Sequence, residues 1–103
     1  MKNTAHEKYL AELQSILFKV FQNENVRIVL FGSRARNAEH RASDVDIGIL
    51  AKDKLEDKKF SSAKEAIENS NIPFKVDLVN LNQVSDSFRQ EVFKEAVLWK
   101  GYH

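Results

Sequence analysis

DVDIGILA, residues 44–51 of the chain, places two acids in an otherwise apolar run. The β-branched and aliphatic residues of this stretch predict a strand. Side chains alternate across a strand, so we expect Asp44 and Asp46 on one face and Val45, Ile47 and Ile49 on the other. At a rise of about 3.3 Å per residue, the Cα atoms of the two acids should lie roughly 6.5–7 Å apart. The two carboxylates could then converge on one cation, which would offset their mutual repulsion.

The type of cation follows from the ligands. Mg²⁺ prefers oxygen ligands and completes its shell with water and substrate phosphates, so the pair Asp44 and Asp46 is a candidate magnesium site. The alternative for an isolated Asp-x-Asp is that Asp44 caps a turn and Asp46 faces water on an open sheet. That arrangement is the common one.

A third acid lies in a later predicted strand, residues 75–81. Asp77 is flanked there by Val76, Leu78 and Val79, and a carboxylate among aliphatic residues is costly unless it is exposed or paired. If the two strands are neighbours, Asp77 can join Asp44 and Asp46, and the third acid can activate an attacking hydroxyl. The alternative is that Asp77 faces solvent on an edge strand.

Upstream, residues 26–31 (VRIVLF) predict a buried strand that ends at Gly32-Ser33. Glycine permits close backbone approach, and Ser33 is predicted as the N-cap of a short helix. Amide groups at a helix N-terminus can hold phosphate, although Gly-Ser after a strand is more often an ordinary turn. Arg34 and Arg36 follow and could bind phosphate oxygens; the alternative for them is a solvated loop.

The remaining pattern predicts a small domain. We expect helices over residues 4–22, 57–70 and 87–96, with a short edge strand at 97–99. Ser87 and Gln90 have the spacing of a capping box. The predicted fold class is α/β (α+β), a small mixed β-sheet of three to four strands flanked by helices.

Composition excludes several classes of protein. The chain has 103 residues, 43% apolar and 30% charged, which predicts one globular domain over residues 1–103. The absence of cysteine excludes disulfides and thiolate metal sites. We expect no signal peptide, no membrane span and a cytoplasmic location. The net charge of +1 and the lack of a basic stripe argue against binding of long nucleic acid.

Together, three segments resemble the signature of the minimal nucleotidyltransferases of the DNA polymerase beta superfamily. These are Gly32-Ser33, then Ser43-Asp44-Val45-Asp46, then Val76-Asp77-Leu78. Each segment alone is not specific for a family, but the three segments in this order, on three predicted strands, are a specific signature. The resemblance covers roughly residues 26–99 and implies the nucleotidyltransferase fold. The sequence departs from the family at Asn37, where members usually carry glycine.

The resemblance implies transfer of a nucleoside monophosphate, AMP from ATP, with release of pyrophosphate. Asp44, Asp46 and Asp77 would be the catalytic and metal-binding residues, with two Mg²⁺ ions. Gly32 and Ser33, with Arg34 and Arg36, would hold the triphosphate. Such a reaction depends on positioning and charge neutralisation, which suits a site of carboxylates, metals and amides.

The resemblance also implies a partner. The chain has no room for the domains that clasp nucleic acid in polymerases, so we expect the acceptor on another molecule. Similar nucleotidyltransferases pair with HEPN-domain toxins and neutralise them by attaching AMP to a tyrosine, which makes this chain a candidate antitoxin. Two alternatives stay open: a non-catalytic module that occludes its partner, and a freestanding transferase that modifies a small molecule such as an aminoglycoside. Homo-oligomer formation also stays open.

Overall fold

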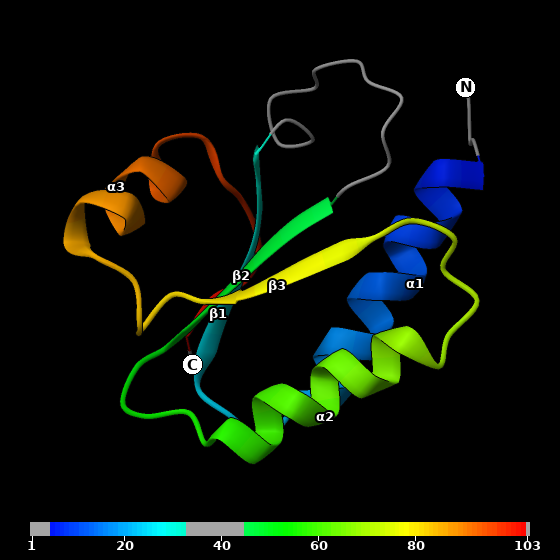
Figure 1. Cartoon of the computed structure of the whole chain (residues 1–103), viewed down its shortest axis with the longest axis horizontal. Helices are drawn as coiled ribbons and strands as arrows, with labels where there is room; N and C mark the ends of the chain where they lie inside the picture. Colours follow the sequence, from blue (N-terminus) through cyan, green and yellow to red (C-terminus); the bar gives the residue numbers. More distant parts are fainter. Residues whose placement is uncertain (1–4, 33–44, 103) are drawn as a thin grey trace.

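The computed structural model describes residues 5–32 and 45–102 of the chain. In this part the element order is α1 (Ala5–Val20), β1 (Val26–Phe31), β2 (Val45–Ala51), α2 (Asp57–Glu68), β3 (Val76–Asn80), α3 (Asp86–Glu95) and β4 (Val97–Lys100) (Figure 1). A sheet of four strands with three helices confirms the predicted α/β class. No helix within the described ranges has the length and apolar character needed to cross a bilayer.

The sheet is mixed, in the order β3-β2-β1-β4. β1 pairs antiparallel with both β2 and β4, whereas β2 and β3 are parallel. Parallel neighbours need a crossover connection, and α2 provides it between β2 and β3. The condition under which Asp77 can join the acids of the other strand, that β2 and β3 are neighbours, is therefore met through this crossover.

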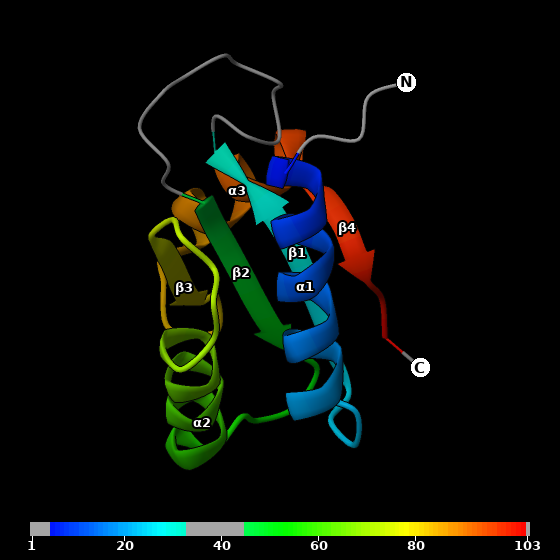
Figure 2. The same ribbon diagram turned by 90° about the vertical axis from the view of Figure 1, so that its right-hand side faces the viewer.

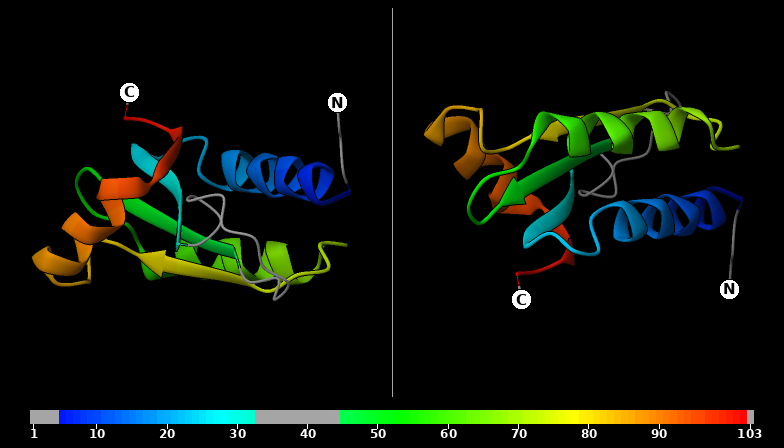
Figure 3. Two further views of the ribbon diagram at one scale, coloured as in Figure 1. Left: turned by 90° about the horizontal axis from the view of Figure 1, so that it is seen from above. Right: turned by 90° about the horizontal axis from the view of Figure 1, so that it is seen from below.

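The three layers follow from the alternation of side chains. Val45, Ile47 and Ile49 of β2 are fully buried and pack in one cluster with residues of α1 and α2, such as Leu13 and Ala63. The opposite face of the sheet is covered by α3, where Val29, Leu81 and Val92 form a second, smaller cluster. Figure 2 shows α1 and α2 in front of the sheet and α3 behind it, and Figure 3 shows α1 and α2 side by side.

Gly48 permits the close approach of the chain after β3. A Cβ atom at Gly48 would come within 2.6 Å of Leu81 Cδ1 and 3.2 Å of Val29 Cγ2. The missing side chain therefore leaves space that Leu81 fills on the α3 face. This contact brings the start of the β3–α3 connection down onto the sheet.

The element boundaries mostly follow the sequence, with one wrong prediction. The β1 prediction is confirmed at both ends, and α2 ends two residues earlier than expected, at Glu68. The capping box of Ser87 and Gln90 is wrong, because α3 begins at Asp86 and Ser87 lies inside its first turn. The N-cap is Ser85, whose Oγ accepts a hydrogen bond from the Phe88 amide at 3.1 Å. Ser85 offers the same capping oxygen as Ser87 two positions earlier.

Candidate active site

Two of the predicted acids lie side by side at one end of the sheet. Asp46 of β2 and Asp77 of β3 are register partners in the parallel ladder, so their Cα atoms are about 4.8 Å apart and their side chains leave the same face. Asp46 is half-buried, while Asp77 on the edge strand is exposed. Both acids are on the α3 face, opposite Val45, Ile47 and Leu78 of the larger core. The arrangement brings two carboxylate-bearing residues to neighbouring positions on one face of the sheet.

Gly32 lies directly against Asp46. β1 runs antiparallel to β2, and the partner of Asp46 in β1 is Phe31, so the residue after the strand reaches the same end of the sheet. Gly32 has φ +80°, and a Cβ built on it would collide with the Asp46 carboxylate at Oδ2. Only glycine avoids both the positive-φ strain and this collision. The first residue of the Gly-Ser motif thus touches the acid with which the sequence associates it.

The other predicted site residues lie outside the described ranges. These are Ser33, Arg34, Arg36 and Asp44, together with Asn37. Within residues 5–32 and 45–102 no group of three or more His, Cys, Asp or Glu side chains could hold a metal ion. The described part therefore contributes two of the three predicted acids, and the predictions for Asp44 and for the loop remain predictions.

An aromatic pair beside the acids was not predicted. Phe31 and Phe88 make an edge-to-face contact, with ring centroids 6.3 Å apart and an interplanar angle of 83°. Phe88 is nevertheless 42% exposed. Helical spacing places Phe88 four residues before the buried Val92, which would predict a core residue. Only the tertiary structure shows that Phe88 reaches past the core to the residue next to Asp46.

Arg89 attaches α3 to the end of β3. Its guanidinium donates to the carbonyl oxygens of Leu81 at 3.0 Å and Val84 at 3.2 Å, and to Asp86 Oδ1 at 2.9 Å. These bonds satisfy backbone groups of the β3–α3 connection that no helix or strand uses. Arg89 therefore positions the helix that carries Phe88, and no spacing in the sequence indicates this role.

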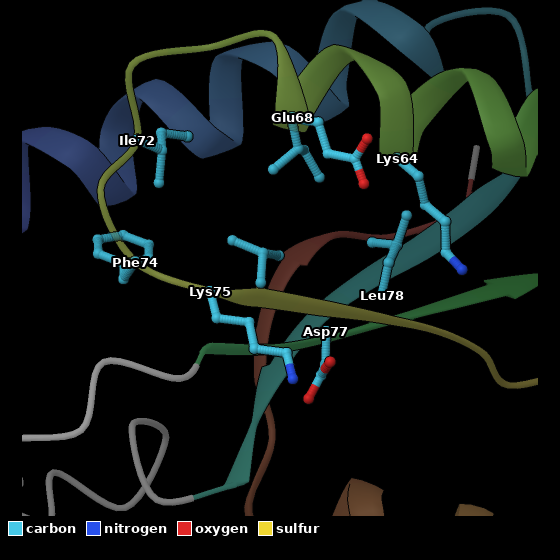
Figure 4. Close-up of a pocket in the computed structure, with 9 residues that line it drawn as sticks. Lys64, Glu68, Ile72, Phe74, Lys75, Asp77 and Leu78 are labelled. Carbon is cyan, nitrogen blue, oxygen red and sulfur yellow. The ribbon is translucent and has the colours of Figure 1, made fainter.

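A lysine on the same face as Asp77 was also missed. Lys75 precedes Asp77 by two residues, so strand alternation places both side chains on one face. The same reasoning that paired Asp44 with Asp46 would have found it. Figure 4 shows both side chains leaving the strand on the side away from α2. They border a groove of about 380 Å³ between α2 and β3 that is lined by Lys64, Glu68 and Ile72, among others.

One protein family matches the part of the chain that carries this site. The family model of the polymerase beta nucleotidyltransferases matches residues 13–100, which include Gly32, Asp46 and Asp77. The chain belongs to this family. The match extends from α1 to β4, so it covers the whole sheet and all the site residues predicted from the sequence.

A comparison with an individual protein is more specific than the match to the family. The chain is 32% identical over 68 residues to "Probable protein adenylyltransferase MntA" of Haemophilus influenzae, which covers 66% of this chain and 60% of that protein. The chain therefore spans less than two thirds of the length of that curated relative.

Two solved structures are similar in fold and sequence. A crystal structure of a toxin–antitoxin with AMP-PNP matches with a TM-score of 0.67 and 28% identity, over 87% of this chain and 74% of that one. A candidate minimal nucleotidyltransferase matches with a TM-score of 0.72 and 25% identity, over 89% and 93% of the two chains. Nucleotidyltransferase proteins thus share this sheet and these helices.

Proposed function

We propose that this chain is a Mg²⁺-dependent adenylyltransferase that moves AMP from ATP to a hydroxyl group of a partner protein. The proposed partner is a HEPN-domain toxin, and the chain is the antitoxin that neutralises it. The observation that carries the proposal is the register of Asp46 with Asp77 beside Gly32, at the end of the sheet where the Gly-Ser motif begins. Similarity to an adenylyltransferase and to a toxin–antitoxin structure with an ATP analogue supports the nucleotide and the partner.

The side chains fit a magnesium site. Carboxylate oxygens are the ligands that Mg²⁺ selects, and register pairing puts those of Asp46 and Asp77 on one face at neighbouring positions. Asp44, two residues before Asp46, would supply a third carboxylate and allow two ions. When bound, Mg²⁺ neutralises charge on the phosphate oxygens and orients them. The acids would hold the ions, and their own repulsion would be relieved on binding.

The proposed reaction balances as a displacement at the α-phosphorus of ATP. A bond forms between the acceptor oxygen and this phosphorus, and the bond from phosphorus to the oxygen that bridges the β-phosphate breaks. Pyrophosphate leaves, and the acceptor proton passes to the Asp77 carboxylate. Asp77 suits this role because it is exposed on the edge strand, where a second protein can approach.

The Gly-Ser motif would hold the triphosphate. Gly32 has no side chain between its backbone and the site, so phosphate oxygens could approach the amide groups that follow it. Ser33, Arg34 and Arg36 would add hydrogen bonds and positive charge to the tail. Because ATP is the proposed donor, we also place the reaction in the cytoplasm. No long nucleic acid takes part.

Transfer of label tests the proposal. The chain is incubated with Mg²⁺ and α-³²P-labelled ATP, with and without the product of the adjacent reading frame, and labelled protein is detected after electrophoresis. We expect label on the partner, no label without Mg²⁺, and a loss of about 100-fold or more in Asp46→Asn and Asp77→Asn, because positioning and charge neutralisation supply most of the rate. Absence of label under all conditions would contradict the proposal.

Asp53→Asn is the matched control. Asp53 is an exposed residue just after β2, at the end of the strand opposite Asp46, so the same chemical change there should leave transfer unchanged. A double variant, Asp44→Asn with Asp46→Asn, separates catalysis from occlusion. Loss of toxin neutralisation by this folded variant supports transfer, whereas full neutralisation without label would show that occlusion suffices.

A further inference from the structure

Lys75 is a cation at the candidate site that none of the three motifs includes. The amide of Val45 donates to the Lys75 carbonyl oxygen at 2.9 Å, so the pairing of β2 with the segment leading into β3 extends back to Lys75. Its side chain therefore follows the same alternation as Asp77. In Figure 4 the side chains of Lys75 and Asp77 leave on one side, and Lys64 and Glu68 lie on α2 at the other.

Within the part of the chain that the structure describes, no contact of the fold depends on the Lys75 ammonium group. Lys75 is exposed, and within the described ranges its side chain has neither an ion pair nor a hydrogen bond. Two other lysines form ion pairs: Lys94 pairs with Glu91 at 3.1 Å, and Lys59 lies 4.0 Å from Glu24. The Lys75 ammonium group is therefore available to an anionic substrate that binds at Asp46 and Asp77.

The strand order indicates which part of the substrate Lys75 meets. Asp46 of β2 lies between Gly32, at the end of β1, and Asp77 of the edge strand β3, which Lys75 precedes by two residues. If Gly32 and Ser33 hold the triphosphate tail, Lys75 lies on the opposite side, where the acceptor approaches the α-phosphorus. An ammonium at this position would stabilise the negative charge that develops as the acceptor oxygen attacks, and would contribute little to binding of the tail.

We infer that Lys75 is a further catalytic residue of this site, which contacts the reacting α-phosphate in the transition state on the acceptor side. The inference rests on the proposed adenylyl transfer. It assigns the charge of Lys75 to the chemical step and not to nucleotide binding. For this role the Lys75 ammonium group must also lie close enough to Asp77 to repel a cation that is bound there.

Steady-state kinetics of label transfer test the first requirement. Lys75→Met should lower kcat by about 10- to 100-fold with the KM for ATP changed by less than about threefold. Lys75→Arg, which keeps the charge, should retain kcat within about threefold. Lys64→Met, which removes a lysine from the helix side of the same groove, should behave as the wild type. An unchanged kcat in Lys75→Met, or equal losses in the Met and Arg variants, would overturn the inference.

Binding of Mn²⁺ without nucleotide tests the second requirement and does not depend on activity. A nearby positive charge opposes metal binding, so Lys75→Met should bind Mn²⁺ about two- to fivefold more tightly, by electron paramagnetic resonance at low salt. Asp77→Asn should bind it more weakly, and Lys64→Met should not change. Unchanged or weaker Mn²⁺ binding by Lys75→Met would overturn the inference.

The two assays separate failure of the inference from failure of the proposed function. If the wild-type protein transfers label and Lys75→Met transfers it at the same rate, only the role of Lys75 is refuted. Wild-type protein that transfers no label refutes the proposed function, and with it the catalytic role of Lys75. In that case the Mn²⁺ measurement still determines whether Lys75 lies within electrostatic reach of the acids.

Discussion

Asp46 and Asp77 are chemically identical but differently placed. Asp46 lies in the interior of the sheet, between Phe31 of β1 and Asp77 of β3, with the Gly32 backbone against its carboxylate. Asp77 is on the edge strand and exposed. A fixed carboxylate suits a metal ligand, and an accessible one suits a group that must also meet the acceptor. The two roles proposed for the acids therefore follow from strand position.

Gly32→Ala is the most direct test of the contact between the motif and the acid. The new Cβ would collide with the Asp46 carboxylate, at a residue whose φ of +80° disfavours alanine. The carboxylate must shift, and a displacement of about 1 Å at such a site can cost about 100-fold in rate. We expect label transfer to fall by at least about tenfold.

Gly101→Ala is the control for this substitution. A Cβ there would meet only Leu98 Cδ2 at 3.8 Å, an ordinary contact, so transfer should be unchanged. Circular dichroism would establish that both variants are folded. Transfer at the wild-type rate by Gly32→Ala would contradict the structure around Asp46.

At the level of elements, Arg89 adds polar contacts to the apolar packing of α3 through Val92. Arg89 donates two hydrogen bonds to backbone carbonyls of the β3–α3 connection and one to Asp86 in its own helix. Arg89→Met would leave these acceptors without their donor. We expect the free energy of unfolding to fall by about 1–3 kcal/mol, measured by urea denaturation.

Lys94→Met in the same helix provides the comparison. Lys94 forms an ion pair with Glu91 in which both side chains are more than 60% exposed, so its removal should change stability by at most about 0.5 kcal/mol. Equal losses in the two variants would contradict the role given to Arg89.

Local pattern predicted the elements better than their pairing. The run of β-branched residues in 26–31 was sufficient to predict both ends of β1. The alternation of side chains along β2 was sufficient to predict that Asp46 faces away from the larger core. The N-cap of α3 was missed because Ser85 and Ser87 are equally good caps by residue type. The register of Asp46 with Asp77 could not be predicted, since it depends on how α2 crosses between β2 and β3, a property of tertiary packing.

On the scale of the whole molecule, the sheet is covered unequally. α1 and α2 cover one face over a large core, while α3 covers part of the other over a smaller cluster. The acids lie on this second face, at the end of the sheet where β1 ends and β2 and β3 begin. The larger core therefore lies on the face away from the acids, and the acids share their face with the Phe31–Phe88 pair.

If the proposed function is correct, Asp46 and Asp77 hold the same bound metal. A crystal structure of the chain with Mn²⁺ and a non-hydrolysable ATP analogue tests it through the anomalous signal of the ion. We expect an ion within about 2.5 Å of a carboxylate oxygen of each acid, with the α-phosphate bound to it as well. An ion held by only one of the two acids, or bound elsewhere on the protein, would contradict it.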